Sequence, residues 1–206
     1  METNHSILKI FDNFSNNILF IDENEKSHLY KDVISDSISV YLYLKKIGLK
    51  KGDKIIIQSD SILSTFHIFL ASFIGNFIIC PIDNKSSESE FEMIKNFINP
   101  KIIIKEKLEN YIKIDHNITL EDIEIEYDKD YLMILTSGTT GIPKGIIFNN
   151  TSILASANYF SKLIDYDENS RVYHILPIHY MAGVLNTFFA AILAGSSIVL
   201  GKVFQP

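Results

Sequence analysis

Residues 136–145 of the chain read Thr136-Ser137-Gly138-Thr139-Thr140-Gly141-Ile142-Pro143-Lys144-Gly145. The apolar run Tyr131–Leu135 precedes them and predicts a buried strand. Glycines let backbone N–H groups turn towards a small anion, while the hydroxyl groups add donors and the lysine adds a positive charge. This composition favours a loop that binds the oxygens of a polyphosphate.

Two well-known phosphate loops do not fit the spacing. A Walker loop has its Gly-Lys pair after four intervening residues, but counting from Gly138 the position of that glycine is occupied by Pro143. A dinucleotide-binding fingerprint needs a second glycine where Thr140 stands. The remaining interpretations are a different phosphate loop and a flexible turn between two strands, and the length of the ordered pattern favours the first.

The loop resembles the signature loop of the adenylate-forming superfamily, which includes acyl-CoA synthetases, aryl-CoA ligases, firefly luciferase and the adenylation domains of peptide synthetases. In that family a carboxylic acid attacks the α-phosphate of ATP to give acyl-AMP and pyrophosphate. The thiol of coenzyme A or of a phosphopantetheine arm then accepts the acyl group as a thioester. The resemblance implies that ATP, arriving with Mg²⁺, is bound by Thr136, Ser137, Gly138, Thr139, Thr140, Gly141 and Lys144.

Two residues are the candidates for catalysis. Lys144 is expected to stabilise charge on the phosphates, and the alternative is a solvated loop lysine. Residues Leu176–Gly183 resemble the family's Leu-Pro-x-x-His-x-x-Gly segment, which implies that His179 lies beside the carboxylate and the acyl pocket. Without that context, a histidine that bonds a backbone carbonyl would be the better interpretation. His174 lacks such neighbours and is interpreted as structural.

The resemblance extends over roughly residues 18–204. The segment Gly48–Lys54 looks like the family's amino-terminal entry, and Gly75–Asp83 is similar to its glycine-to-Pro-x-Asp segment. Asn150 stands where many members have histidine. Members are much longer, so residues 1–206 are expected to be the amino-terminal part of an AMP-binding domain, without the carboxy-terminal half and the small lid domain. Such a part is expected to expose apolar surface and to make no acyl-AMP unaided.

The hydrophobic pattern predicts an α/β fold, with a mostly parallel sheet and helices on both faces. Short apolar strands alternate with amphipathic helices, and Gly48, Gly75 and Pro100 fall at expected helix ends. Ser87 and Glu90 have capping-box spacing. The predicted strands are 18–21, 28–30, 54–58, 77–82, 101–105, 131–135, 145–148 and 198–200, and the predicted helices are 7–14, 31–47, 61–74, 87–98 and 152–164. For 106–130 a short helix and a strand are expected.

Composition excludes several classes of protein. With 206 residues, 47% of them hydrophobic, the chain can bury a large core, and its net charge of −6 argues against a nucleic-acid surface. The single Cys80 cannot form an internal disulfide, which fits a reducing, cytoplasmic location, and its apolar neighbours predict an inert thiol. No secretory signal or metal-ligand spacing is visible. The uncharged stretch Met181–Gly201 is interpreted as a buried helix and strand and not as a membrane span.

The Ser-Gly-Thr-Thr-Gly sequence and the histidine segment favour the acyl-CoA synthetase branch, and with it fatty acid metabolism, over peptide-synthetase domains. The acid that is activated cannot be read from the sequence. Two other hypotheses stay open. One is a non-catalytic nucleotide-binding module, or a subunit that needs its carboxy-terminal half as a separate chain. The other is a membrane protein that uses residues 181–201 as a span.

Overall fold

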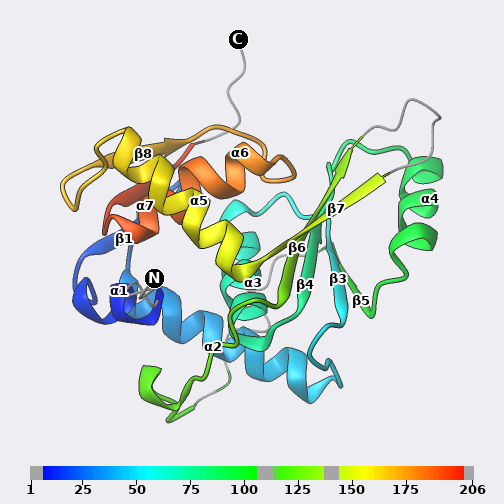
Figure 1. Ribbon diagram of the computed structural model, residues 1–206, viewed down its shortest axis with the longest axis horizontal. Helices are drawn as coiled ribbons and strands as arrows, with labels where there is room; N and C mark the ends of the chain where they lie inside the picture. Colours follow the sequence, from blue (N-terminus) through cyan, green and yellow to red (C-terminus); the bar gives the residue numbers. More distant parts are fainter. Residues whose placement is uncertain (1–6, 106–113, 115, 137–143, 202–206) are drawn as a thin grey trace. The chain divides into compact units, whose positions relative to one another are not determined.

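The computed structural model describes residues 7–105, 114, 116–136 and 144–201 (Figure 1). It divides into two compact units, and each is described here by itself. Unit 1 comprises residues 1–36, 117–123 and 153–206, and unit 2 comprises residues 37–116 and 124–152. Predictions for residues 137–143 and 106–113 fall outside the described residues.

Unit 2 contains a five-stranded sheet in the order β5-β3-β4-β6-β7. Strands β3, β4, β5 and β6 are parallel to their neighbours, and β7 pairs with β6 in the antiparallel direction. The near-continuous isoleucine runs of β3 and β5 are typical of parallel strands. The bounds are β3 Lys54–Ile57, β4 Ile78–Pro81, β5 Ile102–Ile104, β6 Asp130–Thr136 and β7 Lys144–Asn149.

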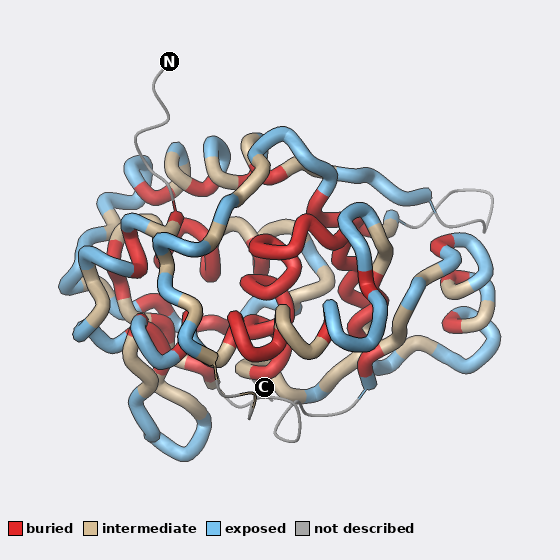
Figure 2. Tube along the Cα trace, turned by 90° about the horizontal axis from the view of Figure 1, so that it is seen from below, coloured by how far each residue is buried: buried red, intermediate tan, exposed pale blue. Residues whose placement is uncertain are grey.

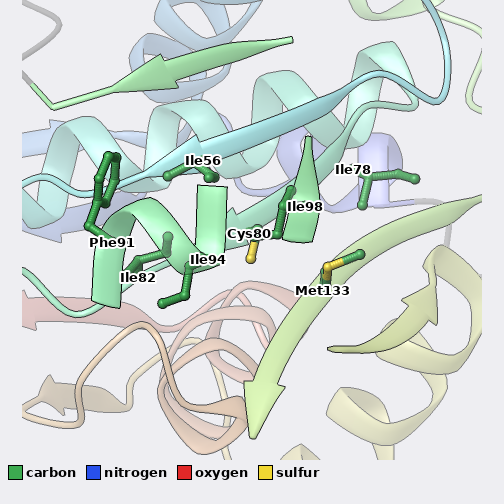
Figure 3. Close-up of a cluster of buried hydrophobic side chains, with 8 residues drawn as sticks. All are labelled: Ile56, Ile78, Cys80, Ile82, Phe91, Ile94, Ile98 and Met133. Carbon is green, nitrogen blue, oxygen red and sulfur yellow. The ribbon is translucent and has the colours of Figure 1, made fainter. Parts of the chain in front are cut away.

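Helix α4 (Glu88–Ile98) packs against this sheet through a cluster of buried side chains (Figure 3). Its N-cap is Ser87, whose Oγ accepts the backbone N–H of Glu90 at 3.3 Å, as the sequence predicted. The cluster consists of Ile56, Ile78, Cys80, Ile82, Phe91, Ile94, Ile98 and Met133. Burial in it raises the pKa of the Cys80 thiol to about 12, and the predicted apolar surroundings of this residue are confirmed.

Helix α3 (Ile62–Gly75) is buried throughout from Ser64 to Gly75; buried residues are red in Figure 2. The Oγ of Ser61 caps its first turn. Asn76 ends it in the left-handed conformation, with φ of +52°, and its N–H donates to the carbonyl of Ser72. A side chain on Gly75 would collide with the ring of Phe77, so glycine is required there by close approach.

Unit 1 contains a four-stranded sheet in the order β2-β1-β9-β8. Strands β1 and β2 form an antiparallel hairpin, and β1, β9 and β8 are parallel. The stretch from Met181 forms α6, the π-helix η3 and α7 in succession, followed by β9, so the interpretation as a helix and a strand is confirmed. Their bounds are β1 Ile18–Ile21, β2 Ser27–Leu29, β8 Arg171–His174, β9 Ser197–Leu200, α6 Met181–Val184, η3 Leu185–Phe189 and α7 Ala190–Leu193.

No helix among the described residues is both long and apolar enough to cross a membrane. The remaining helices are α1 Ile7–Asn13, α2 Tyr30–Lys46, α5 Asn150–Leu163 and the 3-10 turn η2 Leu120–Asp122. Two of the differences from the predicted bounds concern the starts of helices. Tyr30 opens α2 and does not extend β2, and α5 begins at Asn150, two residues early, because Asn149 Oδ1 accepts the N–H of Ser152 and so caps the first turn. The predicted α/β class is confirmed, with its strands divided between two sheets.

Candidate functional site

The two ends of the glycine-rich loop are held by a β-hairpin. Strands β6 and β7 pair from Leu132 opposite Phe148 to Thr136 opposite Lys144, and they run side by side in Figure 1. At the last pair, Thr136 Oγ1 donates to the carbonyl of Lys144 at 3.4 Å. The hairpin therefore brings Thr136 and Lys144, two of the predicted phosphate-binding residues, to opposite sides of one loop. The other five, Ser137, Gly138, Thr139, Thr140 and Gly141, lie outside the described residues.

Lys144 and Thr136 are both exposed at this end of the hairpin. Gly145, which follows the lysine, has a packing reason to be glycine. A Cβ there would lie 3.1 Å from Met133 Sδ and 3.3 Å from Phe97 Cε1 of α4. Glycine thus lets β7 approach the side chains of β6 and α4 closely, while the preceding lysine keeps its ammonium in solvent.

The loop leaves the sheet at the carboxyl end of β6, which runs parallel to β4 and β3. The connections after β3 and β4 leave at the same edge, and they are tied together. Gln58 Nε2 donates to the carbonyl of Asp83 at 3.2 Å, and Asn84 Nδ2 donates to Asp60 Oδ1 at 2.7 Å. Ligands of open parallel sheets bind at the carboxyl edge of the strands. The geometry thus sets the glycine-rich loop at the edge where a ligand is expected.

His179 lies in unit 1, in a tight turn before α6. The N–H of Tyr180 donates to the carbonyl of Pro177 at 3.1 Å, and the N–H of Gly183 donates to the carbonyl of Tyr180 at 3.0 Å. A Cβ on Gly183 would collide with the carbonyl oxygen of Pro177. The spacing of proline and glycine in this segment therefore has a steric reason. His179 itself is half-buried, and its ring lies 4.4 Å from that of Tyr180, centroid to centroid.

His174, at the end of β8, is buried and hydrogen-bonded, as expected for a histidine with a structural role. Its Nδ1 lies 2.6 Å from Thr187 Oγ1, which in turn donates to the carbonyl of Gly183 at 2.9 Å. Because the hydroxyl proton of Thr187 is used on that carbonyl, His174 Nδ1 must donate. Burial lowers the pKa of His174 to about 4, so the imidazole is neutral.

Thr187 is a residue that the sequence analysis missed. It links His174 to the carbonyl of Gly183, the last residue of the predicted histidine segment, and it lies in the π-helix η3. Single π-turns occur frequently at functional sites. The signal available in the sequence was the four-residue spacing between Gly183 and Thr187, which suits a bond from a helix hydroxyl to the carbonyl one turn earlier.

The predicted site residues are thus brought together only in part. Thr136 and Lys144 meet in unit 2, whereas His179 belongs to unit 1. Over the described parts of the chain, no three His, Cys, Asp or Glu side chains are grouped so that they could hold a metal ion. A magnesium ion at this edge would need oxygen ligands from the nucleotide that brings it.

A family model described as "AMP-binding enzyme" matches residues 12–206. A "CoA ligase" of Gibberella moniliformis is 35% identical over 89 residues, which are 43% of this chain and 15% of that protein. The malonate–CoA ligase of Arabidopsis thaliana is 35% identical over 69 residues, which are 34% of this chain and 11% of the relative. The crystal structure of ATP-bound MatB from Rhodopseudomonas palustris superposes with a TM-score of 0.86 at 16% identity. That match covers 97% of this chain but 45% of MatB.

Proposed function

The chain belongs to the AMP-binding enzyme family, and we propose that it forms the amino-terminal part of an ATP-dependent ligase that activates a carboxylic acid. In the first step a carboxylate oxygen attacks the α-phosphate of ATP and pyrophosphate leaves. In the second, a thiol of coenzyme A or of a carrier attacks the acyl carbon, and AMP leaves. The names of the relatives, CoA ligase and malonate–CoA ligase, support this reaction and make malonate the first acid to test.

In this proposal residues 136–145 bind the β- and γ-phosphates. The observation that carries it is the hairpin that closes this loop at the carboxyl edge of the parallel strands, with Thr136 and Lys144 opposite one another. The loop glycines, Gly138 and Gly141, would expose backbone N–H groups, while Ser137, Thr139 and Thr140 would supply hydroxyl donors. Mg²⁺ bound to ATP would reduce the repulsion between the triphosphate and an incoming carboxylate.

Lys144 is the residue whose role is tested most directly. Its side chain is exposed and forms no ion pair within the part of the chain that the structure describes, so its ammonium can reach a phosphate oxygen. There it stabilises charge that develops on the leaving pyrophosphate. We expect Lys144→Ala to weaken Mg·ATP binding to the chain by about tenfold or more, measured by isothermal titration calorimetry.

Lys162→Ala is the matched control, because it removes the same charge from an exposed position on α5. Equal affinities of the two variants, or a wild-type chain that shows no saturable binding of Mg·ATP, would contradict the assignment of the loop.

His179 is assigned to the carboxylate of the acid substrate. In its turn Gly183 packs closely against the carbonyl of Pro177, and the His179 side chain is half-buried. We expect His179→Ala, made in the complete enzyme, to raise the KM for the acid and to slow acyl-AMP formation, with the KM for ATP little changed. Wild-type rates with every acid tested would exclude this role.

A second candidate function is a non-catalytic subunit that needs its carboxy-terminal half as a separate chain. The supporting observation is that the fold spans 45% of MatB. Both proposals predict no pyrophosphate release from ATP by this chain alone, with malonate or with longer acids, and clear turnover would exclude the subunit. A reading frame that follows directly and encodes the remaining half would favour a split enzyme.

A further inference from the structure

Three buried polar atoms at the end of α3 and the start of α5 have no hydrogen-bond partner among the described residues. They are the Oγ of Ser72, the Nδ2 of Asn76 and the Oδ1 of Asn150. Ser72 and Asn150 are 0% exposed and Asn76 is 2% exposed. Buried polar groups are nearly always satisfied by protein or by internal water, so three unpaired atoms in one unit require an explanation.

The three residues are linked by hydrogen bonds. Asn150 Nδ2 donates to Asn76 Oδ1 at 3.3 Å, and Ser72 is one helical turn before Asn76, whose backbone N–H donates to the Ser72 carbonyl. The unpaired atoms are also complementary: the Asn76 amide nitrogen donates, the Asn150 oxygen accepts, and the Ser72 hydroxyl does both. A single water molecule can accept from the first, donate to the second and bond to the third.

Turning the side-chain amides by 180° does not give every polar atom a hydrogen-bond partner. Asn150 Nδ2 also donates to the carbonyl of Glu126 at 3.4 Å. Turning the Asn150 amide by 180° would set its Oδ1 against that carbonyl, an acceptor against an acceptor, whichever way Asn76 points. The carbonyl of Glu126 therefore fixes the orientation of the Asn150 amide, which leaves its Oδ1 without a partner among the described residues.

Asn150 also closes the base of the hairpin that carries the glycine-rich loop. Its backbone N–H donates to the carbonyl of Lys129 at 3.0 Å, directly before β6, and its side chain bonds Glu126 and Asn76. Asn150 follows the last residue of β7, so the chain entering the hairpin and the chain leaving it are joined at this residue. The loop that begins at Thr136 is at the opposite end of the same two strands.

We propose that Ser72, Asn76 and Asn150 bind one internal water molecule, and that Asn150 is a positioning residue that fixes the hairpin base and thereby the loop at its far end. The second part rests on the proposed binding of ATP phosphates by that loop; the first part does not. Internal water acts here as a structural ligand that joins the end of α3 to the start of α5.

Thermal unfolding of the full chain tests the water. Ser72→Ala removes one hydrogen bond to it. Asn76→Gly removes another, together with the bond from Asn150 Nδ2, and keeps the left-handed backbone that glycine readily adopts. We expect each change to lower Tm by about 2–4 °C. Combined, they should lower Tm by no more than the larger single change, because the two side chains have no direct bond and share one water.

The sign of the Ser72→Ala effect is decisive. Removing a hydroxyl that is buried and unsatisfied is neutral or stabilising. An unchanged or higher Tm, or additive effects of the two changes, would overturn the water site. A crystal structure with water within hydrogen-bond distance of Asn76 Nδ2 and Asn150 Oδ1 would establish it directly.

Calorimetric titration with Mg·ATP tests the positioning role. We expect Asn150→Ala to weaken binding by about tenfold. The control is Ser37→Ala, which removes a buried hydroxyl bonded to His67 at 3.2 Å in the same unit and should lower Tm without changing Kd. If Asn150→Ala does not fold, Asn76→Gly takes its place. Unchanged affinity in the folded variant would overturn the positioning role alone, whereas a wild-type chain that binds no Mg·ATP would overturn it together with the proposed function.

Discussion

Single residues set the pH response of this fold, and His174 is the clearest case. Burial lowers the pKa of His174 to about 4, below its ordinary value of 6.5. The unfolded chain therefore binds a proton between these two values while the folded chain does not, so stability falls as the pH falls through this window. The loss of unfolding free energy from this residue is about 2 kcal/mol between pH 7 and pH 5.

The variant His174→Asn keeps an amide N–H near the position of the imidazole Nδ1 that bonds Thr187, and it has no titrating group. We expect its unfolding free energy, measured by urea denaturation at pH 7 and at pH 5, to fall less than that of the wild type by about the same 2 kcal/mol. His28→Gln is a suitable control, because it replaces a histidine of the same unit that pairs with Asp22 near the surface. If the His174 variant has the pH dependence of the wild type, the prediction that His174 is neutral in the folded chain is wrong.

At the level of elements, the packing of α4 determines where the hairpin lies. Ile94 of α4 is 6% exposed and shares its cluster with Met133 of β6 (Figure 3). We expect Ile94→Ala to reduce the unfolding free energy by about 2–5 kcal/mol through the cavity that it leaves. Met93→Ala, next to it on the same helix and 45% exposed, is the control and should cost much less. Equal losses in urea denaturation would contradict the packing described.

Elements whose causes are local could be predicted from the sequence. The cap at Ser87 and the isoleucine strand of β3 each follow from a few neighbouring residues. Helix α3 was predicted to close at Gly75, but the left-handed residue that ends it is Asn76. The division of the strands between two sheets could not be predicted, because parallel pairing joins segments far apart in the chain, such as Phe20 and Ile198. Strand patterns fix which residues are buried but not which strand is the neighbour.

In the candidate site, too, some residues could be predicted from the sequence and others could not. The motif alone selected Thr136 and Lys144, and a hairpin between them follows from two apolar runs that flank a glycine-rich loop. Thr187 and Asn150 were not recognised as partners of the site, since their bonds depend on tertiary contacts with His174 and Asn76. Gly183 was selected by resemblance, but its steric reason, the carbonyl of Pro177, is visible only in the folded chain.

For the whole molecule, the path of the chain between the two units determines how it unfolds. The chain passes from one unit to the other at residues 36/37, 116/117, 123/124 and 152/153. Two of these points lie inside helices, α2 and α5. Cutting there removes about half of α2 and most of α5, and short isolated helical segments are marginal in water.

We therefore expect the excised segment 37–152, which contains all of unit 2, to lack the single cooperative transition of the full chain when it is followed by circular dichroism on heating. The control is a chain shortened to residues 7–206, which removes only the first six residues and should melt like the wild type. A sharp transition of the excised segment at the wild-type Tm would show that unit 2 folds without the rest.

Strand β7 is the last strand in the described order of its sheet, and the side chains of Ile146 and Ile147 are 48% and 42% exposed on it. Consecutive strand residues point to opposite sides, so the strand is apolar above and below. An apolar edge strand of this kind readily pairs with a strand of another molecule. Purified at high concentration, the isolated chain should self-associate along it, and a lysine in place of Ile146 should keep the preparation monodisperse.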